Sequence, residues 1–143
     1  MNISYTKIDP AGNITVIVDS FVPREQQSRV AAELMKRDVT VEQVGFLEKP
    51  DDPCCAVRLQ MMGGEFCGNA ARAFACYAAG VRGRGETRLS VAISGAKNPV
   101  PVEIEPASGR AYAQMPLPCA LDRLCADGRD TAVSYTHLRA HET

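Results

Sequence analysis

The chain has 143 residues and a formal net charge of -1, with 45% hydrophobic and 23% charged residues. This length and composition suit one globular domain with a buried core, and no apolar run reaches the roughly 20 residues of a membrane-spanning helix. The near-neutral charge balance lacks the basic surface that nucleic-acid binding requires, so we expect neither nucleic acid nor membrane among its partners.

The first half of the chain predicts strands around one helix. Apolar and polar side chains alternate before Gly12-Asn13, and β-branched residues follow that turn, which indicates a hairpin. Further on, Val30, Leu34 and Met35 have the spacing of one apolar helix face. The predicted elements are strands at 3–9 and 14–19, a helix that begins at Pro23, and strands at 39–48 and 54–61.

The second half predicts an alanine-rich helix over 68–79, ended by Gly80. Because this helix is apolar nearly all round, we expect it to be buried. Arg72 is the exception, and we expect it to pair with a carboxylate or to cap backbone carbonyls. Three more strands are predicted at 87–94, 100–105 and 110–115. Together these elements predict an α+β domain in which a curved mixed or antiparallel sheet surrounds a central helix.

Cys67 stands at the mouth of the second predicted helix, followed by Gly68 and Asn69. The first amides of a helix lack internal partners and carry partial positive charge. A thiol ionises more readily there, and a carboxylate can dock on the free N–H groups of Gly68 and Asn69. This combination indicates chemistry on an amino acid. Each residue also has an interpretation without a functional role. Cys67 is then a buried structural thiol, Gly68 and Asn69 simply start the helix, and Asn13 is a plain turn residue. Glu65 is predicted to be a solvated loop charge.

The six cysteines of the chain give no sign of a disulfide framework or a metal site. No Cys-x-x-Cys pair is present, and no charged segment followed by an apolar one resembles a secretion signal. We therefore predict a cytoplasmic protein without a bound metal. Cys54 and Cys55 are expected to be buried in a strand, and Cys76 to pack on the far side of the helix that Cys67 begins.

Four segments in a fixed order resemble the cofactor-independent amino-acid racemases and epimerases related to diaminopimelate epimerase. The segments are Asp9-Pro10-Ala11-Gly12-Asn13, Glu42-Gln43-Val44-Gly45-Phe46, Met62-Gly63-Gly64-Glu65-Phe66-Cys67-Gly68-Asn69-Ala70 and Val91-Ala92-Ile93-Ser94-Gly95. They look most like the histidine racemases of staphylopine-type metallophore pathways. The resemblance covers residues 3–118 and implies the fold of a diaminopimelate epimerase-like domain.

The resemblance also implies roles for four residues. Cys67 matches the first of two catalytic cysteines, which act without pyridoxal phosphate or any other cofactor. Gly68 and Asn69 match the cradle for the substrate carboxylate, and Asn13 matches a substrate-binding position. In this family, two similar domains enclose the active site, and each supplies one cysteine. One thiolate removes the α-proton, and the other cysteine delivers a proton to the opposite face.

The sequence departs from diaminopimelate epimerases before the cysteine. Their Asn-x-Asp-Gly-Ser stretch is replaced by Gln60-Met61-Met62-Gly63-Gly64, and Ala70 stands where they carry glycine. The asparagine expected to bind diaminopimelate is missing, which favours another amino acid such as histidine. Three alternatives stay open: a diaminopimelate epimerase, an isomerase of the phenazine-biosynthesis type, and a non-catalytic thiol or interaction domain.

Residues 133–143 look like translated sequencing adapter rather than native protein. Both histidines of the chain, His137 and His141, lie in this tail, so the remainder offers no imidazole base. We therefore predict an N-terminal epimerase-like domain at 1–118, an exit segment toward a missing second domain at 119–132, and a non-native tail at 133–143. The fragment alone is expected to be inactive, and the complete enzyme is expected to bind an amino-acid substrate. A homodimer is one assembly that stays open for the complete enzyme.

Overall fold

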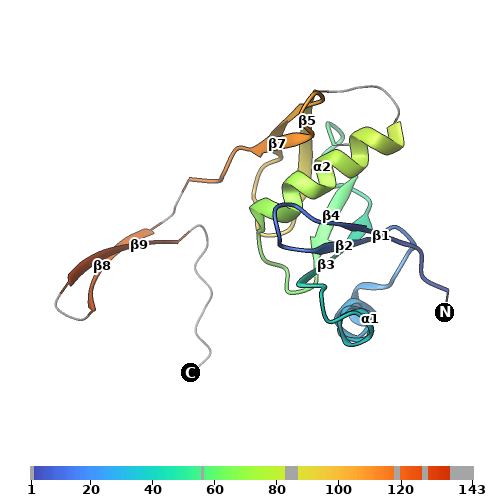
Figure 1. Ribbon diagram of the computed structural model, residues 1–143, viewed down its shortest axis with the longest axis horizontal. Helices are drawn as coiled ribbons and strands as arrows, with labels where there is room; N and C mark the ends of the chain where they lie inside the picture. Colours follow the sequence, from blue (N-terminus) through green and yellow to red (C-terminus); the bar gives the residue numbers. More distant parts are fainter. Residues whose placement is uncertain (1, 56, 83–86, 118–119, 127–128, 136–143) are drawn as a thin grey trace.

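A computed structural model of the chain describes residues 2–55, 57–82, 87–117, 120–126 and 129–135. Within these residues, a body of seven strands and two helices is followed by a two-stranded hairpin (Figure 1). The elements are β1 (Tyr5–Ile8), β2 (Thr15–Val18), α1 (Arg24–Arg37), β3 (Gln43–Glu48), β4 (Arg58–Met61), α2 (Gly68–Arg82), β5 (Arg88–Ile93), β6 (Val100–Glu105), β7 (Arg110–Ala113), β8 (Ala120–Ala126) and β9 (Arg129–Tyr135).

The strands of the main sheet follow their order in the chain, from β1 at one edge to β7 at the other. β2 pairs in parallel with β3, and β4 with β5, whereas the other neighbouring pairs are antiparallel. A parallel pair needs a crossover connection, and each crossover here is a helix. α1 joins β2 to β3, and α2 joins β4 to β5. The predicted mixed sheet is therefore confirmed, and each helix belongs to one parallel pair.

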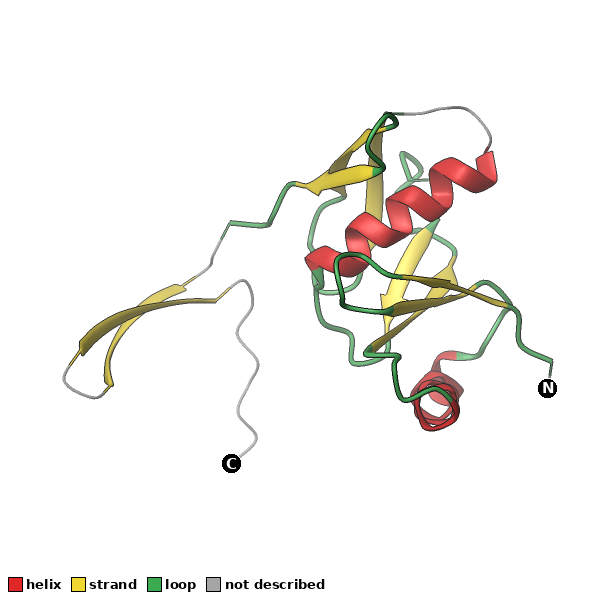
Figure 2. Ribbon diagram, in the orientation of Figure 1, coloured by secondary structure: helices red, strands yellow, loops and turns green. Residues whose placement is uncertain are grey.

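Helix α1 packs against one face of β2 and β3 (Figure 2). Val16 and Val18 of β2 belong to the buried cluster on that face. The predicted apolar face of α1 is confirmed, because Val30, Leu34 and Met35 all pack against the same cluster. All four residues of β2 are buried, which follows from the coverage of both faces of this strand.

Helix α2 lies in the larger core, which uses the opposite face of β2. Ile17 points to this side and shares a cluster with Phe74, which is fully buried. α2 contacts β2 at one side and β5, β6 and β7 at the other, so the sheet bends around it (Figure 1). Ala70, Ala71 and Ala75 are also fully buried, and their small side chains let the strands approach the helix closely. The predicted burial of this helix is confirmed.

Three details of the predicted elements are wrong. The third strand begins later than expected, because Asp38 Oδ1 accepts the N–H of Thr40 at 3.0 Å and bends the chain there. The fourth strand also begins later, since Cys54 donates its N–H to Asp52 Oδ1 at 2.8 Å in a turn. Cys54 is consequently exposed rather than buried. Helix α2 continues through Gly80, because glycine weakens a helix without ending it.

The hairpin of β8 and β9 lies apart from the body of the domain in Figure 1. It lies in the segment at 119–132, which was predicted as an exit toward a missing second domain, and extends into the first residues of the predicted tail. The predicted boundary after Ala132 falls inside β9, and residues 136–143 lie outside the described residues. The non-native origin of 133–143 therefore stays a prediction. No helix in the described part of the chain is both long and apolar enough to cross a membrane.

Candidate functional site around Cys67

Cys67 caps the N-terminus of α2. Its carbonyl oxygen accepts the N–H of Ala71 at 2.9 Å, and its Sγ accepts the N–H of Ala70 at 3.4 Å. Cysteine thus occupies the position at which serine, threonine or aspartate commonly caps a helix. The N–H groups of Gly68 and Asn69 have no hydrogen-bond acceptor among the described residues. The structure therefore places a thiol and two open amides at one helix start, while their chemical roles stay predictions.

The Cys67 thiol also contacts the first residue of β3. Its S–H donates to Oε1 of Gln43 at 3.0 Å. Thr15 Oγ1 lies 3.5 Å from the same Oε1 and donates to the carbonyl oxygen of Asn13 at 3.2 Å. A chain of contacts therefore runs from Cys67 through Gln43 and Thr15 to Asn13. The sequence pattern indicates no role for Gln43 or Thr15, although each is a polar residue at the start of an otherwise largely apolar strand.

One end of the sheet gathers these residues. The parallel pairing of β2 and β3 sets Thr15 beside Gln43. β4 runs antiparallel to β3, and its last residue, Met61, pairs with Gly45. The chain that leaves β4 therefore reaches the same end, where α2 begins. Asn13 immediately precedes β2, and its Oδ1 is buried without a hydrogen-bond partner among the described residues.

The loop that leads to the thiol is held by the turn after β5. Ser94 Oγ donates to the carbonyl oxygen of Glu65 at 2.9 Å and accepts the N–H of Met61 at 2.9 Å. Gly95 has φ +76°, and a Cβ at this residue would overlap the backbone nitrogen of Phe66. Only glycine tolerates both the left-handed conformation and the close approach. This turn thus fixes the path of the chain from β4 to the helix start.

A cavity of about 580 Å³ opens at the start of α2, a size typical of small-molecule sites. The sulfur of Met115 lies 2.8 Å from the point that a Cβ on Gly68 would occupy, so Met115 lies over the first helical turn. Tyr112 and Met115 are each 56% exposed. The lining residues are Phe66, Cys67, Gly68, Asn69, Arg72, Ala111, Tyr112, Ala113 and Met115.

Two charged residues near the thiol differ from expectation. Arg72 donates from Nη2 to Oδ1 of Asn69, so its partner is a side-chain amide rather than a carboxylate or a backbone carbonyl. Glu65 is half-buried rather than solvated, and its Oε2 is buried without a partner among the described residues. This oxygen lies 2.5 Å from the position of a Cβ on Gly63, so the carboxylate folds back over that glycine.

Cys54, Cys55 and Cys76 are poorly suited to ionise. Burial raises the pKa of Cys76 and of Cys55, and the hydrogen bond to Asp52 raises the pKa of the exposed Cys54. Cys119 lies outside the described residues. Among the residues that the structure does describe, no three His, Cys, Asp or Glu side chains gather closely enough to hold a metal ion.

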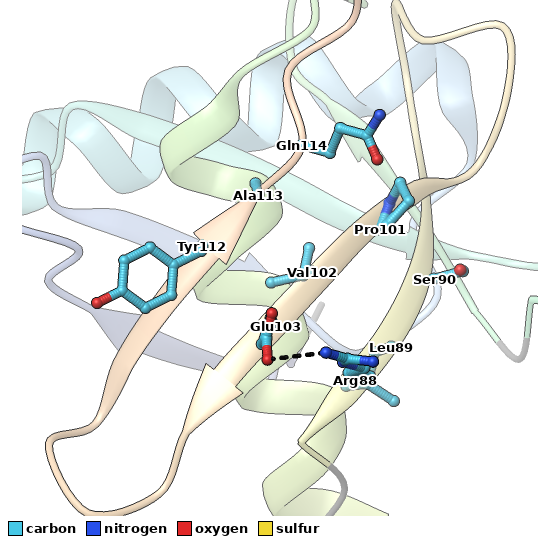
Figure 3. Close-up of a pocket in the computed structure, with 9 residues that line it drawn as sticks. All are labelled: Arg88, Leu89, Ser90, Pro101, Val102, Glu103, Tyr112, Ala113 and Gln114. Atoms are coloured by element: carbon cyan, nitrogen blue, oxygen red, sulfur yellow. Dashed lines mark hydrogen bonds and ion pairs between the residues drawn. The ribbon is translucent and has the colours of Figure 1, made fainter.

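A second cavity, of about 550 Å³, lies on β5, β6 and β7 and contains none of the predicted site residues. Figure 3 shows Arg88 of β5 and Glu103 of β6 joined by an ion pair of 3.3 Å, with Tyr112 on β7. The two charged side chains are 80% and 58% exposed, and such ion pairs contribute little to stability. Tyr112 lines this cavity and the one at Cys67. Because the cavity on β5, β6 and β7 contains none of the predicted site residues, we centre the candidate site on Cys67.

Comparison with known proteins identifies the class to which this domain belongs. The chain belongs to a family of racemase N-terminal domains. The family is described as "Histidine racemase CntK N-terminal domain", and its model matches residues 2–142. This match includes most of the stretch at 133–143, whose adapter origin nevertheless stays a prediction.

The curated relatives that this chain matches are named histidine racemase. A histidine racemase of Fusobacterium nucleatum subsp. nucleatum is 45% identical over 75 residues, which are 51% of this chain and 26% of the relative. A histidine racemase of Staphylococcus aureus is 38% identical over 74 residues, which are 50% of this chain and 27% of the relative. The matched stretch therefore covers about a quarter of the length of these curated relatives. The predicted resemblance to histidine racemases is confirmed.

Proposed function

We propose that this chain is the N-terminal domain of a cofactor-independent histidine racemase with the diaminopimelate epimerase-like fold. The observation that carries the proposal is Cys67, a half-buried thiol that caps α2 and lines a cavity beside two open amides. Family membership and the names of the relatives support histidine as the substrate. The sequence change before Cys67 supports the same choice over diaminopimelate.

The proposed chemistry needs two thiols. A cysteine thiolate takes the α-proton of the amino acid and becomes a thiol, leaving a carbanion at Cα. A second thiol on the opposite face gives its proton to that carbon and becomes a thiolate. No electrons are gained or lost, so the step needs no redox partner. Cys67 serves one face, and a cysteine of a second domain, outside this chain, serves the other.

The carbanion must be stabilised, because the α-proton of an amino acid is a weak acid. Preorganised N–H groups aimed at the substrate carboxylate stabilise negative charge that develops during proton removal. In this proposal, the open amides of Gly68 and Asn69 bind that carboxylate, and Asn13 binds the substrate nearby. Closure by the second domain excludes water and strengthens these interactions.

The test is α-deuterium exchange in heavy water, with the full-length protein that contains this domain. We expect exchange and inversion of histidine without added pyridoxal phosphate or metal, and little activity on diaminopimelate or other amino acids. Exchange of diaminopimelate in preference to histidine would refute histidine as the substrate. Absence of exchange with every amino acid tested would refute the proposed racemase activity. We expect the complete enzyme to act in the cytoplasm. Sedimentation of the full-length protein would test whether it forms a homodimer.

A further inference from the structure

Arg72 is a cation near the start of α2. It lies on the second turn, beyond the first-turn amides at which the helix dipole acts most strongly. Its side chain is half-buried and lines the cavity at Cys67. Within the described part of the chain, no carboxylate lies within ion-pair distance of it. A half-buried guanidinium that lines a cavity without a carboxylate partner calls for a function.

The hydrogen bond from Arg72 to Asn69 determines which way the amide of Asn69 faces. An asparagine amide has one oxygen that accepts and one NH₂ group that donates. The Arg72 guanidinium takes the oxygen, which leaves the donors of Asn69 available. The backbone N–H groups of Gly68 and Asn69 are open donors of the same cavity. An amide turned the other way would present its oxygen, which repels a carboxylate.

We propose that Arg72 is a positioning residue, which holds the Asn69 amide with its oxygen turned away from the substrate carboxylate. This inference rests on the proposed function, because it requires a carboxylate at the start of α2. Arg72 acts through Asn69, and its charge additionally favours an anion in the cavity.

The test is a double-mutant cycle in the full-length protein, with Arg72→Met, Asn69→Ala and the double variant. We expect Arg72→Met to weaken histidine binding about tenfold in titration calorimetry, the effect of one lost charge-assisted hydrogen bond. Histamine, which lacks the carboxylate, should bind both proteins equally. In the Asn69→Ala background, Arg72→Met should weaken binding clearly less than it does in the wild type. Arg72→Lys, which keeps a charged donor, should retain most of the affinity.

Arg29→Met is the matched control, because Arg29 is an exposed arginine of α1. It should leave the affinities unchanged. Equal losses of affinity for histidine and histamine would overturn the positioning role. So would a double variant whose loss of affinity equals the product of the losses in the two single variants.

A spectroscopic readout separates this inference from the proposed function. The side-chain NH₂ resonances of Asn69 in nitrogen-15 spectra should shift in Arg72→Met and shift less in Arg72→Lys. Unchanged resonances would overturn the positioning role even in an active racemase. A wild-type protein that neither binds nor exchanges histidine would instead overturn the proposed function, and with it the need for a carboxylate at this helix.

Discussion

The thiol of Cys67 lies 3.0 Å from the side-chain oxygen of Gln43, a residue 24 positions earlier in the chain. This contact joins the start of α2 to the start of β3. Because the sulfur donates to Gln43 and accepts from the N–H of Ala70, two hydrogen bonds fix the direction of the thiol. A proton-transfer group must be held in one geometry to act on a bound substrate. Gln43 therefore belongs to the candidate site, although its residue type alone gives no hint of this.

Replacement of Gln43 by leucine should slow the exchange reaction. Leucine fills a similar space but leaves the thiol without its acceptor. The loss of one hydrogen bond, about 1 kcal/mol, corresponds to roughly fivefold slower α-deuterium exchange in the full-length protein. Gln26→Leu, at an exposed site on α1, is the matched control and should leave the rate unchanged. Equal rates for Gln43→Leu and wild type would show that the contact has no part in catalysis.

Cys67→Ser should greatly reduce inversion without unfolding the protein. Serine is similar in size and caps helices well, but its hydroxyl is a far weaker acid than a thiol. We expect α-deuterium exchange to fall by at least about 100-fold, the usual contribution of an acid–base group. Cys76→Ser, on the same helix, should affect stability more than rate, because this thiol is half-buried. Near-normal exchange by Cys67→Ser in a folded protein, checked by circular dichroism, would place the catalytic thiol elsewhere.

Much of the fold could be predicted because the pattern of apolar residues records burial. β2 and the apolar face of α1 follow directly from β-branched and helical spacing. The errors lie where a single side chain overrides that pattern. Val39 is apolar and suits a strand, but it is 88% exposed because Asp38 turns the chain by bonding to Thr40. Such local hydrogen bonds depend on side-chain conformation, which periodicity does not contain.

The candidate site could be predicted only in part. The placement of Cys67 before a helix follows from local sequence, since the flanking glycines and alanines indicate where the helix begins. The contact with Gln43 depends on the parallel register of β2 and β3, which no local pattern reveals. The same holds for Ser94, whose hydroxyl supports the loop before Cys67 from a distant turn. Long-range pairing therefore hides the supporting residues from sequence reasoning.

Gly95→Ala should destabilise the domain more than Gly109→Ala does. Both glycines have positive φ, +76° and +68°, so both variants incur the left-handed strain of about 1–2 kcal/mol. A Cβ on Gly95 would in addition overlap the backbone of Phe66, whereas nothing lies within 4 Å of one on Gly109. We expect urea unfolding to show a difference of at least about 1 kcal/mol between the two variants. Equal losses of unfolding free energy in the two variants would mean that the loop before Cys67 shifts easily to make room for the added Cβ.

Alkylation should distinguish Cys67 from Cys54, Cys55 and Cys76. At neutral pH, iodoacetamide reacts with thiolates, and raised pKa values slow the reaction of Cys54, Cys55 and Cys76. Cys67 borders an open cavity at a helix N-terminus and should be modified first. Peptide mapping by mass spectrometry after short exposure measures each cysteine separately. In the full-length protein, bound histidine should protect Cys67 from alkylation. Faster labelling of the half-buried Cys76 would contradict the assignment of Cys67 as the most reactive of these thiols.

Glu48 should make the domain sensitive to acid. Burial by itself would raise the pKa of Glu48, but hydrogen bonds from Arg24 and Gln27 outweigh it and leave the pKa below its ordinary value. A carboxylate with a lowered pKa stabilises the folded state above the pKa of the unfolded chain. That contribution is lost as the pH falls through the folded pKa, because the folded state must then take up the proton. The free energy of unfolding should therefore fall as the pH drops below about 5.

Glu48→Gln removes the titrating group and should flatten this part of the profile, because an amide cannot take up the proton. Glu33→Gln, at an exposed site of α1, is the control and should follow the wild-type profile. Asp38 titrates separately, because hydrogen bonds from Lys7 and Thr40 lower its pKa to about 2. The Glu48→Gln protein should therefore keep the part of the acid dependence that extends toward pH 2. Urea unfolding at a series of pH values measures both contributions, and identical profiles for wild type and Glu48→Gln would refute the role of this carboxylate.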